Sequence, residues 1–221
     1  MDLALKLVEI ICTIFITIAF FISIVHRSKK YLFPIQLYIF SCLILNIIDL
    51  AFGFYGKNQY RFVMYAIYNI QTIFEIFLIL YFFYVRLKRK GFRNALISFI
   101  SFFLLICFVL WIKKESAFFL YIPALLGIEA FLITSASLLY LYEILNNDYL
   151  EDLKSNPNFI ITCGILFNFG ITVPIYFCWD TLFNLAPGSY RILSIISQIC
   201  FNILIISIVK AYLCPIPNHQ R

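Results

Sequence analysis

Seven long apolar segments, separated by short polar stretches, occupy almost the whole of the 221-residue chain. The segments cover residues 4–25, 34–55, 62–85, 94–112, 118–143, 158–178 and 192–213. A helix of about 20 apolar residues crosses the ~30 Å hydrocarbon core of a bilayer, and every segment reaches or approaches that length. The pattern therefore predicts an all-α integral membrane bundle of seven transmembrane helices, with residues 1–221 forming a single domain.

The composition supports a membrane protein with the lipid bilayer as its main surroundings. Hydrophobic residues make up 63% of the chain and charged residues 13%, against about 25% charged residues in soluble domains. The net charge of +6 does not indicate nucleic-acid binding, because the basic residues lie between the apolar segments, where they set topology. The first segment lacks a strongly basic start and a small-residue cleavage site, so we expect a retained helix.

Lysine and arginine are unevenly divided between the two sets of loops. Loops one, three and five and the C-terminal end hold eleven of the 17: Arg27, Lys29, Lys30, Arg86, Lys88, Arg89, Lys90, Arg93, Lys154, Lys210 and Arg221. Short loops rich in these residues stay cytoplasmic. We therefore expect the N-terminus outside and the C-terminus in the cytoplasm. The many Ile, Phe, Asn, Lys and Tyr residues are typical of an AT-rich bacterial genome, which suggests a multi-pass protein of the bacterial inner membrane.

Polar side chains within the apolar segments are the candidate site. Glu75 and Glu129 lie about 20 Å and 16 Å from the expected outer helix ends, at 1.5 Å per residue. A charged group at such depth costs several kcal/mol and marks a functional site by default. Shallower acids and several amides accompany these two. We expect a ligand pocket in the outer half of the membrane, lined by Asp49, Asn69, Glu75, Glu129, Gln198 and Asn202.

Two other interpretations of these polar residues stay open. The acids can be protonated or hydrogen-bonded and serve only to hold helices together, or they can form a path for protons or cations. The polar residues concentrate in helices three, five and seven, which we expect in the bundle interior, whereas the uncharged helix over 94–112 should be the most lipid-exposed. Pro123 and Pro174 are expected inside helices five and six, where proline bends a helix.

Catalytic and metal-binding motifs are missing from the sequence. The two histidines, His26 and His219, lie at an interface and in the tail, and the seven cysteines are scattered singly. A zinc site needs a cluster of such ligands, and no hydrolase, protease or phosphate-loop motif occurs. We therefore expect no metal, no cofactor and no enzymatic activity.

Several short motifs resemble a known group of proteins. They are YNI at 68–70, FEIF at 74–77, YFFY at 81–84, YLYE at 140–143, PNF at 157–159 and GILF at 164–167. Over roughly residues 62–212 the chain resembles small bacterial seven-helix membrane proteins of unassigned function, in which a tryptophan often stands where this chain has Ile160. Such proteins are often encoded beside sensor histidine kinases. The resemblance carries over Asn69, Glu75 and Glu143, and it implies a membrane input module for a signalling partner.

The expected function is therefore a sensor or receptor-like signalling module. Its cytoplasmic partner, such as a histidine kinase, would bind the acidic residues Asp148, Glu151 and Asp152 of loop five. The basic loop over 86–93 is expected to set topology and attract anionic lipids, at about 1 kcal/mol per charge. A small proton- or cation-coupled transporter, a structural subunit of a membrane complex, a lipid-modifying enzyme and a homo-oligomer stay open. In a transporter of two parallel three-helix repeats, helices three and seven would correspond, and both carry amides.

Overall fold

The computed structural model describes residues 3–26, 29–55, 61–113, 122–146, 153–179, 181 and 189–214. In this part of the chain the long elements are α1 (Leu3–Val25), α2 (Phe33–Tyr55), α3 (Arg61–Arg86), α4 (Lys90–Lys113), α5 (Pro123–Leu145), α6 (Pro157–Phe177) and α8 (Ser189–Leu213). Two short 3-10 helices, η1 (Lys30–Leu32) and η3 (Leu153–Ser155), precede α2 and α6. All seven long helices are long and apolar enough to cross a membrane. The predicted all-α architecture with seven such helices is confirmed.

Helix boundaries differ from the prediction at the starts of two helices. Helix α5 begins at Pro123, with Ile122 in an extended conformation before it. The predicted bend at Pro123 is wrong, because proline at the first helical position lacks only an N–H that would be unpaired anyway. Helix α4 begins at Lys90, ahead of the predicted residue 94, and the N–H groups of Phe92 and Arg93 bond to the Arg89 carbonyl. Pro174 does lie inside α6, as predicted.

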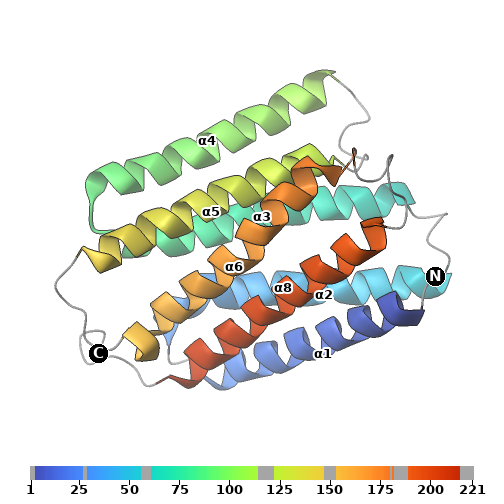
Figure 1. Ribbon diagram of the computed structural model, residues 1–221, viewed down its shortest axis with the longest axis horizontal. Coiled ribbons are helices and arrows are strands. Elements are labelled where there is room, and N and C mark those ends of the chain that lie inside the picture. The colour runs from blue at the N-terminus through green and yellow to red at the C-terminus, as the bar shows by residue number, and fades with distance from the viewer. Residues whose placement is uncertain are drawn as a thin grey trace.

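Six of the helices form a closed ring. Helix α1 contacts α2, α2 contacts α3, α3 contacts α5, α5 contacts α6, α6 contacts α8, and α8 returns to α1. Helix α4 lies outside the ring, against α3 and α5 (Figure 1). Only 17% of its span is buried, compared with 50% for α5. The prediction that this helix is the most exposed of the seven is confirmed.

The ring consists of two groups of three helices, here called triplets. Within each triplet neighbouring helices are antiparallel, and the two triplets have the same orientation along the bundle (Figure 1). Helices α1, α2 and α3 form one triplet, and α5, α6 and α8 form the other. The triplets meet at two junctions, α3 with α5 and α8 with α1, where the neighbouring helices are parallel (Figure 1). The start of α1 and the end of α8 lie at opposite ends of the bundle (Figure 1).

The most buried helices are not quite those expected. Helices α5, α6 and α3 bury 50%, 44% and 39% of their spans, whereas α8 buries 22%. The expectation of helix seven in the interior is therefore wrong, and α6 takes that place. Gly164 of α6 has no side chain, so α6 approaches α8 closely, and the buried side chains of Thr162 and Thr172 are also small.

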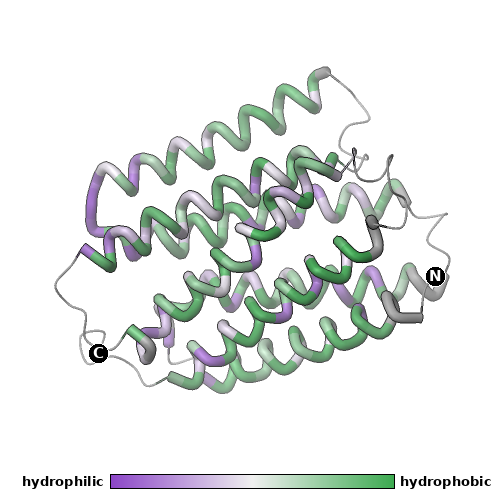
Figure 2. The backbone as a smooth tube through the Cα atoms, viewed as in Figure 1, coloured by the Kyte–Doolittle hydropathy of each residue, from purple (hydrophilic) through white to green (hydrophobic). Residues whose placement is uncertain are grey.

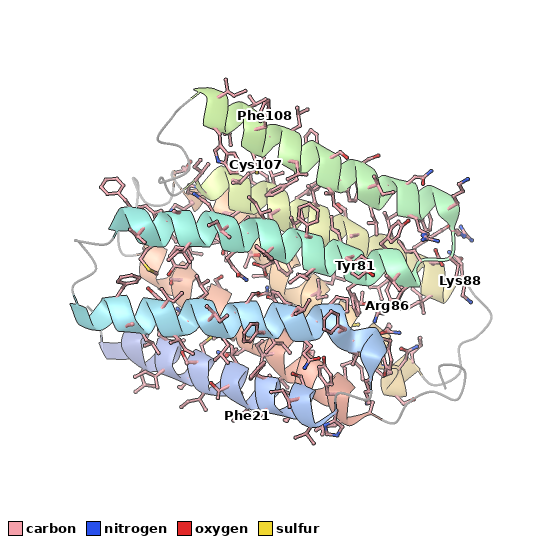
Figure 3. All side chains as sticks on the ribbon, turned by 180° about the vertical axis from the view of Figure 1, so that it is seen from behind. Phe21, Tyr81, Arg86, Lys88, Cys107 and Phe108 are labelled. Atoms are coloured by element: carbon pink, nitrogen blue, oxygen red, sulfur yellow. The ribbon has the colours of Figure 1, made fainter. Side chains whose placement is uncertain are left out.

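The half of the bundle nearest the C-terminus is densely packed. Tyr38, Phe82, Phe83 and Tyr212 are fully buried there, within a continuous apolar core. Figure 2 shows hydrophobic residues along every helix, with hydrophilic positions gathered where α3 passes into α4. Large apolar side chains also cover the outer surface, and those of Phe21 and Phe108 point away from the bundle (Figure 3). This outer surface suits contact with lipid chains rather than water.

Candidate ligand pocket

A polar pocket of about 290 Å³ lies inside the six-helix ring, towards the end of the bundle where the chain begins. Every helix of the ring contributes to it, and none of its described lining residues comes from α4. The lining residues are Glu9, Cys12, Cys42, Leu45, Asn46, Asp49, Tyr68, Gln71, Glu75, Leu126, Glu129, Ala130, Asn168, Phe169, Thr172, Tyr176, Ser197, Gln198 and Phe201. Residues from six segments far apart in the sequence thus share one enclosure.

Four carboxyl groups line this pocket. Glu9 comes from α1, Asp49 from α2, Glu75 from α3 and Glu129 from α5. No lysine, arginine or histidine is among the described residues that line it. Glu75 and Glu129 belong to α3 and α5, which are neighbours in the ring, and both line the pocket. The pocket is therefore suited to positive charge, or to uptake of protons by the carboxyls themselves.

Two oxygen atoms in the pocket lack hydrogen-bond donors. Glu129 is only 3% exposed. Within the described part of the chain, neither its Oε1 atom nor the Oε1 atom of Gln198 has a hydrogen-bond partner. Buried polar groups in proteins are normally paired, and each exception calls for an explanation. These two acceptors therefore mark the place where a donor group from a ligand would be most favourable.

The structure brings together four of the six predicted site residues. Asp49, Glu75, Glu129 and Gln198 line the pocket. Asn69 is buried in α3 but is not a lining residue. Asn202 does not line the pocket either, and its Oδ1 atom accepts a hydrogen bond from Cys12 Sγ at 3.3 Å. Asn69 and Asn202 therefore lie outside the pocket lining, and their part in ligand binding stays a prediction.

Several pocket residues were not predicted as site residues. Glu9, Asn46 and Gln71 were visible as polar residues within apolar helices, and all three line the pocket. Helical spacing would have indicated two of them as site residues, because Asn46 lies three residues before Asp49 and Gln71 four residues before Glu75. Residues at these spacings share one helix face. The aromatic and hydroxyl lining residues of α3, α6 and α8 carried no comparable signal.

The opposite end of the bundle is held together by buried basic residues. The Arg86 guanidinium donates to Asn158 Oδ1 at 2.8 Å, to the Phe82 carbonyl at 2.6 Å and to the Tyr31 carbonyl. It also lies 3.7 Å from the centre of the Phe82 ring. Arg86 thereby joins α3 to α6 and to the link between α1 and α2, as Figure 3 locates it at the end of α3.

Lys29 makes a second connection at this end. Its buried ammonium donates to the carbonyls of Ala211 at 3.3 Å, of Tyr212 at 2.7 Å and of Cys214. Two of these carbonyls lie in the last turn of α8 and the third belongs to Cys214, the residue after it, where the helix dipole attracts positive charge. Burial lowers the pKa of the Lys29 ammonium from its usual value. Lys29, one of the basic residues expected to set topology, thus also caps the end of α8.

The basic loop before α4 is organised by Glu143 of α5. This buried carboxylate accepts hydrogen bonds from the backbone N–H groups of Lys88 at 2.6 Å and Arg89 at 3.3 Å. Arg89 and Arg93 lie over aromatic rings, the latter 4.3 Å from the centre of the Tyr84 ring. Glu143, singled out by the resemblance, therefore orders the turn between α3 and α4.

The predicted partner-binding residues Asp148, Glu151 and Asp152 lie outside the described residues. Among the residues that are described, no group of three or more His, Cys, Asp or Glu side chains is arranged to hold a metal ion. No protein-family model, curated protein or solved structure matches the chain. The pocket is therefore the feature of this molecule from which a function can be inferred.

Proposed function

We propose that the protein is a receptor-like signalling module of the bacterial inner membrane, whose pocket binds a small positively charged ligand on the outer side. The observation that carries the proposal is the grouping of four carboxyls around one pocket with no basic side chain among its described lining residues. An ammonium group has three hydrogen-bond donors and no acceptor. Such a group would offset the negative charge and pair with the Oε1 atoms of Glu129 and Gln198, which have no hydrogen-bond partner within the described residues.

The signalling part of the proposal is supported by the contacts at the other end of the bundle. A continuous apolar core of described residues lies between the pocket and that end, which favours binding over conduction in this conformation. Arg86 and Lys29 connect α3, α6 and α8 to one short link. A ligand that shifts α3 or α8 would therefore displace this link. We propose a histidine kinase as the partner, bound through Asp148, Glu151 and Asp152.

Binding of butylamine, which is an ammonium ion at neutral pH, tests the ligand class. We expect calorimetry on the protein in lipid nanodiscs to show binding, and Glu129→Gln to weaken it about tenfold, since a charge-assisted hydrogen bond contributes about 1.5–3 kcal/mol. Glu143→Gln makes the same chemical change at the opposite end and should leave the affinity within about twofold. Equal affinity in the wild type and Glu129→Gln would contradict the proposal.

Co-purification tests the partner. Changing Asp148 and Asp152 to asparagine and Glu151 to glutamine together should abolish capture of the kinase and leave butylamine binding unchanged. Retention of the kinase by this triple variant would remove the acidic loop from the proposal.

A proton- or cation-coupled transporter is the second candidate, and the two parallel triplets favour it. Transporters built from parallel repeats bind substrate at the repeat interface. Glu9 and Glu129 each lie six residues after the first residue of α1 and α5, the first helices of the two triplets. Amine uptake into proteoliposomes that is lost in Glu129→Gln would establish transport, whereas the receptor proposal expects binding without flux.

A further inference from the structure

A second cavity lies on the outer side of the ring, between α2 and α3. This α2–α3 groove has a volume of about 350 Å³ and is lined by Leu37, Phe40, Ser41, Ile44, Leu45, Ile48, Ile67, Ile70, Gln71, Phe74 and Leu78. Nine of these eleven residues are apolar. Phe40, Ile44, Ile70 and Phe74 are 44%, 42%, 44% and 57% exposed, so the groove faces the lipid side of the bundle.

The groove and the carboxyl-lined pocket share a wall. Leu45 of α2 and Gln71 of α3 line both cavities. Gln71 Nε2 donates to Ser41 Oγ at 3.1 Å and to Cys42 Sγ at 3.7 Å, so it bridges the two helices where the cavities meet. Ser41 and Gln71 are the polar members of the groove, and both lie at this wall. An apolar cavity open to lipid thus ends at the boundary of an acidic one.

The chemistry changes sharply across this wall. On the pocket side lie Glu75, one turn after Gln71, and Asp49, one turn after Leu45. The buried Glu129 also lines the pocket, and its Oε1 atom has no hydrogen-bond partner among the residues that the structure describes. On the groove side there are hydrocarbon surfaces alone beyond Ser41 and Gln71. A small hydrophilic cation uses only the first of these two environments, whereas a molecule with a charged head and an apolar chain matches both.

We propose that the ligand is an amphiphilic amine that enters from the membrane between α2 and α3. Its ammonium head lies among the pocket carboxyls and its hydrocarbon chain lies in the α2–α3 groove. This inference rests on the proposed cation-binding function and specifies the ligand class of the same site. Charge complementarity places the ammonium head of the ligand among the carboxyls. The shared wall of Leu45 and Gln71 places the start of its hydrocarbon chain. The Gln71–Ser41 hydrogen bond lies across the route and has to open as the ligand passes.

Two amines of different chain length test the inference. Dodecylamine and butylamine carry the same head, and both are titrated into nanodisc-embedded protein with protein-free discs as blanks. Ile44→Trp fills the groove from α2, and Ile47→Trp is its matched control, because Ile47 is exposed on the same helix but does not line the groove. Membrane partitioning is the same for all variants, so changes between variants report the groove alone.

We expect Ile44→Trp to lower the affinity for dodecylamine about tenfold, because the larger side chain occupies the space of the hydrocarbon chain. The affinity for butylamine should stay within about twofold of wild type. Ile70→Trp should act in the same way from α3, with Val63→Trp as its control. Ile47→Trp and Val63→Trp should change neither affinity. Glu129→Gln should weaken both amines equally, because it acts on the head.

Four outcomes would overturn the inference. If neither groove variant affects dodecylamine while Glu129→Gln weakens both amines, the ligand is a small cation and the groove holds bulk lipid, so the proposed function stands alone. If the groove variants weaken the binding of both amines equally, the hydrocarbon chain of the ligand has no separate binding site. If wild-type protein binds neither amine, the proposed function fails together with the inference. A groove variant that instead changes the oligomeric state would assign the groove to a second copy of the chain.

Discussion

Gly164 of α6 lies directly against Ser207 of α8. A Cβ atom placed on Gly164 would fall 2.7 Å from Ser207 Cβ and 2.9 Å from Ser207 Oγ. Carbon atoms in ordinary contact are about 3.5–4.0 Å apart. The absence of a side chain at this single position therefore sets how closely α6 and α8 approach, and with it the position of Thr172 and Gln198 around the pocket.

Gly164→Ala should lower the free energy of unfolding by about 1–3 kcal/mol, because the added methyl group forces α6 and α8 apart. Gly170→Ala is the matched control. Gly170 lies on the same helix, and apart from the nearby backbone of that helix no described atom lies within 4 Å of the added carbon. Alanine is favoured over glycine within a helix by about 1 kcal/mol, so the control should be neutral or stabilising. Unfolding titrations in mild detergent measure both, and equal effects would disprove close packing at Gly164.

Lys29→Met should destabilise the last turn of α8. The change removes the donor for three carbonyls, and we expect a loss of about 1–3 kcal/mol. Lys210→Met is the control, because Lys210 lies exposed in the same helical turn and surface changes cost little. Hydrogen exchange of the amides around Tyr212 reports the effect locally. Unchanged exchange in Lys29→Met would show that the ammonium does not hold this helix end.

Asn202→Ala should separate helix packing from ligand binding. Asn202 accepts a hydrogen bond from Cys12 and does not line the pocket. We therefore expect a loss of about 0.5–1.5 kcal/mol in stability, with the affinity for butylamine within about twofold of wild type. A tenfold loss of affinity in a variant that remains folded would return Asn202 to the binding site.

The orientation in the membrane can be tested with the native cysteines. Cys178 is exposed just after α6, at the pocket end, whereas Cys214 follows α8 at the opposite end. With the N-terminus outside, a membrane-impermeant maleimide should label Cys178 in intact cells. Cys214 should react only after the cells are opened. Cys178→Ser should remove the signal from intact cells, and labelling of Cys214 there would reverse the orientation.

Helix number and most helix ends follow directly from the sequence, because length and hydrophobicity are local properties. Part of the pocket lining could also be predicted from the sequence, for a similar reason. Acids such as Glu75 and Glu129 are conspicuous in apolar segments, and an unfavourable location points to a role. The sequence did not show that Asn69 and Asn202 lie outside the pocket lining, because an amide satisfies its hydrogen bonds equally well at a helix contact or in a pocket.

The contacts between distant segments were beyond sequence reasoning. Whether α6 or α8 is more buried depends on how closely two helices approach at Gly164, and glycine alone does not reveal which neighbour it faces. The roles of Arg86 and Lys29 were hidden because basic residues at helix ends are ordinarily explained by topology. Only their hydrogen bonds to Asn158 and to the end of α8 reveal a structural function.

Helix α4 stands outside the ring, yet the ring could not close in its present form without it. A unit of three antiparallel helices starts at one end of the bundle and finishes at the other. A second unit with the same orientation can follow only after one additional helix runs back along the bundle, and α4 is that helix between α3 and α5. An odd helix of this kind is what joining two like-oriented copies of a three-helix unit end to end would demand. Because α4 brings no described residue to the pocket, its described side chains act by packing against α3 and α5, where Phe103 and Cys107 are buried, and not by contact with a ligand in the pocket.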